Sequence, residues 1–171
     1  MENSVPAQRL TLITSLPEST IEEGRSGIDQ LYTKVLEQAF HNTHVNNSQQ
    51  YHYFRTVVGT ILLTLNPLPI KALSELLGYD IPHIHSTIRS LHSLLLIPDK
   101  PEDPIHTFHK SFPDFLTDPE QCKDNQFFVE PVSHHAEILL SCLGLMGKKL
   151  KKNICNLDDH VVLSEVKDLS A

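Results

Sequence analysis

Two short apolar patterns on either side of a glycine constrain this sequence most strongly. In NPLPIKALSELLGYDIPHIHSTIRSLHSLLLI, apolar residues recur at helical spacing over residues 70–77 and again from residue 81. Gly78 suits the left-handed position that ends a helix, and Asp80 followed by Pro82 is typical of a helix start. The segment therefore predicts a helix-turn-helix. The apolar residues that we expect the second helix to bury are Ile81, Ile84, Ile88, Leu91 and Leu95.

A proline-rich segment follows these two helices. Residues 94–97 are apolar, residues 98–104 read PDKPEDP, and residues 105–109 form a second short run that can pair with the first. Because proline cannot donate to a ladder, we expect the prolines at the tip of a two-stranded hairpin. Helices followed by a hairpin are the winged-helix layout. Ser111 is then expected to cap a short helix, with Asp114 as its partner.

Further helices are expected on both sides of this unit. One runs over residues 28–40, a polar loop covers residues 42–50, and a second helix ends before Asn66-Pro67. Ser133 is expected to cap a long final helix. The residues predicted to form its buried face are Ala136, Leu139, Leu140, Leu143, Leu150 and Ile154. The tail over residues 156–171 has the pattern of one more helix.

The predicted fold class is therefore mainly α, with a winged-helix domain over residues 27–118. A linker, or the end of a preceding helical region, is expected over residues 1–26. A second linker covers residues 119–131. Residues 132–171 are predicted to begin a second helical domain that is cut short at Ala171.

Charge argues against nucleic acid as a partner. The chain carries 14 Lys and Arg against 21 Asp and Glu, a formal net charge of −7. A DNA-reading helix needs several basic contacts to phosphate. The second helix offers one permanent cation, Arg89, and the hairpin tip over residues 99–103 is net acidic. Its other solvent-facing residues are expected to be His83, His85, Thr87, Ser90 and His92.

The residues also give no support for an enzyme or a metal site. The sequence contains neither GxxxxGK[ST] nor HExxH. His83 and His85 diverge on a helix, and His106 and His109 alternate on a strand, so we expect no metal ligands and no catalytic residues. Without a signal peptide or a long apolar run, and with an odd number of cysteines, we expect a cytoplasmic protein that does not contact a membrane.

Several stretches resemble a known family when taken in order: GIDQLYTKVLEQAF, NPLPIKALSELLG, TIRSLHSLLL, PIHTFHKSFPDFLTDPEQC and HHAEILLSCLGLMGKKLKKNICNL. They resemble the winged-helix and following helical region downstream of the nucleotide-binding core in fungal NACHT-domain proteins, relatives of NOD-like receptors. The resemblance implies a non-catalytic regulatory arm of a signalling NTPase. The arm would stabilise the closed, ADP-bound state of a core that lies outside this chain.

The resemblance also implies a role for one histidine. FHKSFPDF fits a family pattern in which a wing histidine contacts the β-phosphate of ADP, which makes His109 the nucleotide-sensing residue, with Lys110 and Ser111 as supporting candidates. This chain is expected to hold no cofactor, whereas the parent would bind ADP or ATP with magnesium. The implied partners are the NACHT core, downstream helical or repeat domains, and other copies of the parent. The alternative is a stand-alone winged-helix protein that binds another protein or, with less support, DNA.

Overall fold

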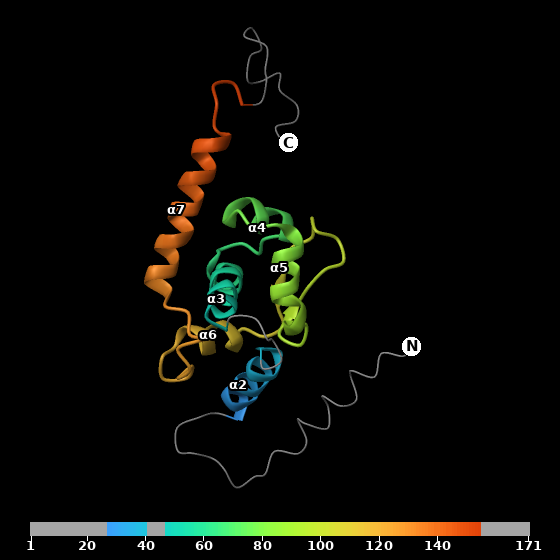
Figure 1. Ribbon diagram of the computed structural model, residues 1–171, viewed down its shortest axis with the longest axis vertical. Coiled ribbons are helices and arrows are strands. Elements are labelled where there is room, and N and C mark those ends of the chain that lie inside the picture. Colours follow the sequence, from blue (N-terminus) through green and yellow to red (C-terminus); the bar gives the residue numbers. More distant parts are fainter. Residues whose placement is uncertain (1–26, 41–46, 155–171) are drawn as a thin grey trace.

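The computed structural model describes residues 27–40 and 47–154, and this part of the chain is mainly helical (Figure 1). The helices are α2 (Gly27–Phe40), α3 (Asn47–Leu63), α4 (Ile70–Leu77), α5 (Ile81–Ile88), α6 (Ser111–Thr117) and α7 (Pro131–Lys149), and a 3-10 turn, η1 (Arg89–Leu91), follows α5. No helix within these residues is long and apolar enough to cross a bilayer. The predicted N-terminal linker over residues 1–26 and the predicted tail helix lie outside the described residues.

The predicted helix-turn-helix corresponds to α4 and α5. Gly78 adopts φ 71° and ψ 21°, a conformation that glycine adopts without the steric cost of a Cβ, and its N–H donates to the Ser74 carbonyl. Asp80 precedes α5 in an extended conformation and Pro82 lies in the first turn, but the Asp80 side chain makes no capping hydrogen bond. The prediction for α5 was too long, because Leu91 lies in η1 and Leu95 lies in a strand. Ile81 is exposed rather than buried.

The two strands are β1 (Leu95–Leu96) and β2 (His106–Thr107), which pair antiparallel with Leu95 opposite Thr107 and Leu96 opposite His106. The predicted strand over residues 105–109 was too long, since β2 ends at Thr107, although the Phe108 N–H still donates to the Leu94 carbonyl at 3.1 Å. The hairpin tip folds back onto the start of α4. Pro69 forms an isolated antiparallel bridge with Pro104, and the N–H of Ile105 donates to the Leu68 carbonyl at 3.1 Å.

The core forms around α3. Its Phe54, Val57 and Val58 are fully buried, and Ile84 and Ile88 of α5 pack into the same cluster. The segment predicted as a linker between residues 119 and 131 also enters this cluster. Phe127 from this segment lies edge-on to Phe54 with ring centroids 5.4 Å apart. Aromatic rings in this arrangement gain a further 0.5–1.5 kcal/mol, roughly, beyond the burial of their area.

Several predicted helix starts are wrong by a few residues. The loop expected over residues 42–50 is too long, because α3 already begins at Asn47. Ser111 is not a cap: the N-cap of α6 is Lys110, and the Ser111 hydroxyl bonds elsewhere. In α2 the inward positions include Tyr32, whereas Ile28 is exposed.

Helix α7 differs most from its prediction. Its N-cap is Glu130, whose carboxylate accepts from the N–H groups of Val132 (3.1 Å) and Ser133 (2.6 Å), so Ser133 is not the cap. The helix lies beside α3 and α4 (Figure 1). It turns the buried His134 toward them, together with residues that are half-buried, namely Ile138, Ser141, Cys142 and Leu145. The predicted apolar face, Ala136, Leu139, Leu140, Leu143, Leu150 and Ile154, is exposed instead.

Candidate functional site

His109 lies in the short connection between β2 and α6 and is exposed. Its Nδ1 accepts the backbone N–H of Ser111 at 3.1 Å and lies 2.6 Å from the Ser111 hydroxyl oxygen. A neutral imidazole has one N–H and one acceptor nitrogen. Because Nδ1 is the acceptor here, the ring proton belongs on Nε2. The local fold thus presents a hydrogen-bond donor on an exposed ring whose other nitrogen is already bound.

Tyr32 holds this arrangement from the core side. Its hydroxyl lies 2.7 Å from the Ser111 hydroxyl, although the two residues are 79 positions apart in the sequence. The Tyr32 ring is buried and packs against Phe112 and Phe115 of α6, with centroids 5.3 and 5.4 Å apart. If Ser111 donates to His109, Tyr32 donates to Ser111, and all three groups are satisfied. We call Tyr32, Ser111 and His109 the hydroxyl relay.

Of the two supporting candidates, the structure brings Ser111 into direct contact with His109. Lys110 is exposed beside them, and no ion pair of its ammonium is found within the described residues. The Lys110 ammonium therefore supplies a positive charge next to His109, and the His109 Nε2–H supplies a hydrogen-bond donor. This combination favours an anionic oxygen as a ligand.

The outer face of the hairpin continues this surface with apolar side chains. Leu96 and His106 stand opposite each other in the ladder, and Phe108 follows His106 at the two-residue spacing that keeps side chains on one face. Leu96 is 52% exposed and Phe108 is 59% exposed. We call Leu96, His106 and Phe108 the hairpin face. His109 is the next residue in the chain after Phe108.

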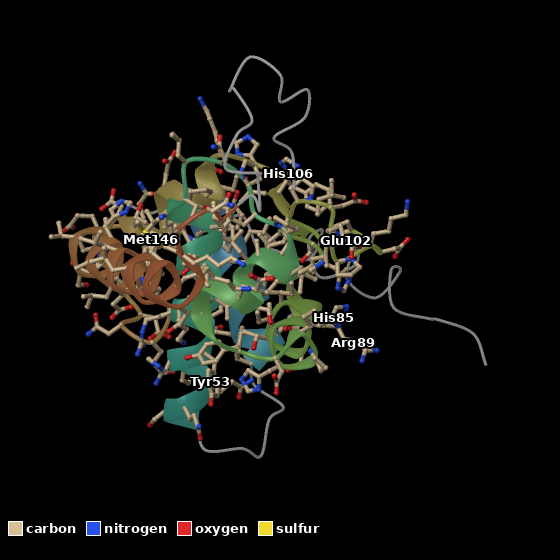
Figure 2. The ribbon with its side chains drawn as sticks, turned by 90° about the horizontal axis from the view of Figure 1, so that it is seen from above. Tyr53, His85, Arg89, Glu102, His106 and Met146 are labelled. Carbon is tan, nitrogen blue, oxygen red and sulfur yellow. The ribbon has the colours of Figure 1, made fainter. Side chains whose placement is uncertain are left out.

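The helix expected to read DNA in a winged-helix protein presents little positive charge. His85 of α5 and Arg89 of η1 are exposed and lie on the same side of the molecule as Glu102 of the hairpin tip (Figure 2). His83 is withdrawn from the solvent face, because its ring packs edge-on against Tyr53 at a centroid distance of 4.2 Å. The helical spacing predicted a solvent-facing His83, because its packing against Tyr53 of α3 depends on a residue 30 positions away.

A small cavity of about 250 Å³ lies between α2, α6 and the turn before α7. Sequence reasoning did not find it, because its lining comes from three separated segments and includes the buried Cys122. The lining residues are Thr33, Leu36, Glu37, Phe115, Cys122, Lys123, Asp124 and Phe127. The cavity does not include any member of the hydroxyl relay.

Metal-ligand geometry is absent from the described part of the chain, where no group of three or more His, Cys, Asp or Glu side chains converges. No family model, curated protein or solved structure matches the chain. The sequence motifs and the geometry around His109 are therefore the two grounds on which a function can be argued.

Proposed function

We propose that this chain is a non-catalytic regulatory module: the winged-helix arm of a NACHT-type signalling NTPase whose nucleotide-binding core lies outside the sequence. The order of elements supports the winged-helix assignment. A helix (α3), a bridging residue (Pro69), two short helices (α4 and α5) and a hairpin (β1 and β2) follow one another. Pro69, just before α4, forms an isolated antiparallel bridge with Pro104. This bridge occupies the position of the third strand that the winged-helix layout has beside its hairpin.

The observation that carries the proposal is the hydroxyl relay. A histidine that senses a phosphate needs a fixed ring and a free N–H donor. Ser111 binds Nδ1 of His109, and Tyr32 anchors Ser111 to the core, so Nε2 is the donor that faces a ligand. In the proposed closed state, this N–H donates to the β-phosphate of ADP held by the core. Lys110 supplies additional positive charge there.

The hairpin face supplies a docking surface around the histidine. Leu96 lies in β1 and Phe108 directly follows β2. Both are large apolar side chains that are exposed. Exposed apolar side chains that gather on one face are typical of surfaces that another protein covers. A core that covers this face would exclude water from the His109–phosphate hydrogen bond and strengthen it. The two cysteines of the described residues, Cys122 and Cys142, are free thiols, in line with a cytoplasmic location.

The experiment is a binding measurement with the separately expressed nucleotide-binding core encoded upstream. The chain is expected to bind the ADP-loaded core more tightly than the ATP-loaded core, and Phe108→Ala is expected to weaken that binding. Glu102→Ala, a change at the exposed tip away from the relay, serves as the matched control. Equal affinity for the two nucleotide states would refute the regulatory role.

A stand-alone winged-helix protein that binds another protein is the second candidate, and the apolar hairpin face favours it over DNA binding. The two candidates differ in the requirement for nucleotide. A stand-alone adaptor would bind its partner through Leu96 and Phe108 without any dependence on ADP. Binding to DNA would instead fall steeply with salt and depend on Arg89, because phosphate contacts release counterions.

A further inference from the structure

Helix α7 exposes an apolar stripe on the side away from the body of the molecule. The stripe consists of Val132, Ala136, Leu139, Leu143 and Met146 of α7 and of Leu150, the C-cap residue that follows the last turn, all of them exposed. The opposite side of α7 carries the buried His134 and faces α3 and α4. Figure 2 shows Met146 on the far side of the molecule from His106 and Glu102, so the stripe is separate from the hairpin face.

The spacing of the stripe is that of a coiled-coil seam. Its members follow one another at intervals of four, three, four, three and four residues, an average near the 3.5-residue repeat of paired helices. An isolated surface helix normally shows polar residues on its solvent side. Here ten consecutive residues from 138 to 147 contain no charged side chain, and Leu140 widens the stripe. A second helix is the occupant that such a seam fits.

The stripe is self-complementary when two copies run antiparallel. A two-fold axis crossing the helix at residue 141 places Val132 opposite Leu150 of the other copy. It also places Ala136 opposite Met146 and Leu139 opposite Leu143. Every apolar member then meets an apolar member, as an isologous interface requires. The small Ala136 of one copy faces the long, flexible Met146 of the other. This pairing lets the two α7 helices keep the same separation along the seam.

Charge at the helix ends selects the antiparallel direction. Lys148, Lys149, Lys151 and Lys152 gather at the C-terminal end of α7, whereas Glu130 caps its N-terminus. A parallel pair would bring the two lysine clusters together. The antiparallel pair places the lysine-rich C-terminal end of one copy near the Glu130-capped N-terminus of the other and also opposes the two helix dipoles favourably. We propose that α7 is a homodimerisation helix that pairs antiparallel with α7 of a second copy of this chain through the stripe.

Sedimentation analysis of the full 171-residue chain over a range of concentrations tests the proposal. The expected result is a reversible monomer–dimer equilibrium. Leu143→Lys is expected to weaken dimerisation by about 100-fold or more, because it would bury an unpaired charge at the centre of the seam. Leu96→Lys is the matched control, since Leu96 is exposed to a similar degree on the hairpin. It should leave the dimer unchanged.

A mixing experiment tests the direction of the helices. Leu139→Glu and Leu143→Lys are each expected to be monomeric alone but to form a heterodimer when mixed. Antiparallel packing places position 139 of one chain beside position 143 of the other, so the new carboxylate meets the new ammonium. In a parallel pair these two positions do not meet, and mixing restores nothing. Circular dichroism should show unchanged helix content in both variants, because both side chains are exposed.

Three outcomes would overturn the inference. The wild-type chain could remain monomeric at every concentration, with the stripe protected from hydrogen exchange, in which case residues 155–171 or another partner cover it. Alternatively, Leu96→Lys could abolish the dimer while Leu143→Lys leaves it intact, which would move the interface to the hairpin face. Absence of a heterodimer on mixing would overturn the antiparallel arrangement.

Discussion

The Nε2 of His134 lies 3.2 Å from the hydroxyl oxygen of Thr60, and this contact joins α7 to α3 within the core. The Thr60 hydroxyl donates to the Thr56 carbonyl at 2.7 Å. The Nδ1 of His134 lies 3.3 Å from the Glu137 carboxylate. Gly59 makes room for the imidazole. His134 is the one residue of α7 that is buried, and the half-buried Ile138 and Leu145 lie on the same side of the helix.

Gly59→Ala is expected to destabilise the fold. A Cβ at this position would lie 2.8 and 2.9 Å from two ring atoms of His134 and 3.0 Å from a Val129 methyl group. Overpacking of this kind costs about 1–3 kcal/mol, which exceeds the gain in helix propensity from replacing glycine. Chemical denaturation followed by circular dichroism measures the effect. Gly144→Ala is the control: nothing lies within 4 Å of its Cβ, so it should stabilise α7. Equal stability changes in the two variants would contradict the packing described for His134.

Stability is expected to fall as the pH is lowered below about 6.5. Burial lowers the pKa of His134 below its ordinary value of 6.5; Glu137 opposes this shift and His135 adds to it. The folded chain therefore binds this proton less tightly than the unfolded chain. The contribution of His134 is complete above the unfolded pKa and is lost as the pH falls toward the lower folded pKa.

The change with pH can be assigned to His134 by substitution. His134→Gln keeps a side-chain N–H for Thr60 but cannot titrate, so its free energy of unfolding should vary less between neutral and mildly acidic pH than that of the wild type. His135→Gln, at an exposed neighbour, is the control. If the pH dependence of His134→Gln equals that of the wild type, other groups cause the acid sensitivity.

Ser111→Ala is expected to release the His109 ring. The substitution removes the hydroxyl that bonds both His109 Nδ1 and Tyr32, and a hydrogen bond of this kind contributes about 1 kcal/mol. The ring nitrogens of His109, observed by ¹⁵N NMR, should report the proton on Nε2 in the wild-type chain and a smaller excess of that tautomer in the variant, where only the backbone N–H of residue 111 still donates to Nδ1. Tyr32→Phe should shift the mixture in the same direction by less, since the Ser111 hydroxyl remains. An identical tautomer population in all three chains would exclude the hydroxyl relay.

Local features of the sequence predicted the elements that depend on neighbours in the chain. The LLG sequence at residue 78 predicted a left-handed helix end, which is confirmed. The mainly helical class and a hairpin with prolines at its tip are also confirmed. The lengths of α5 and of both strands were overestimated, because the apolar runs in the sequence continue beyond the last residues of the helix and of the strand pairing.

The side of α7 that packs inward could not be predicted from periodicity. The sequence pattern favoured the side with Leu139 and Leu143, because it is the more apolar. The structure instead turns His134 and Leu145 toward α3 and α4. A hydrogen bond to Thr60 and the space left by Gly59 accommodate His134 on the inward side, and both involve residues more than 70 positions away. The contact between Tyr32 and Ser111 is hidden from local patterns for the same reason.

The rate of ADP release from the proposed parent NTPase tests the regulatory role most directly. The parent, expressed with its nucleotide-binding core, is loaded with labelled ADP and chased with unlabelled nucleotide. His109→Ala is expected to accelerate release about tenfold, because a hydrogen bond to a charged phosphate contributes on the order of 1.5 kcal/mol or more. His85→Ala, a change at an exposed histidine of α5 outside the hairpin face, should release ADP at the wild-type rate. Equal rates for His109→Ala and the wild type would contradict the sensor role.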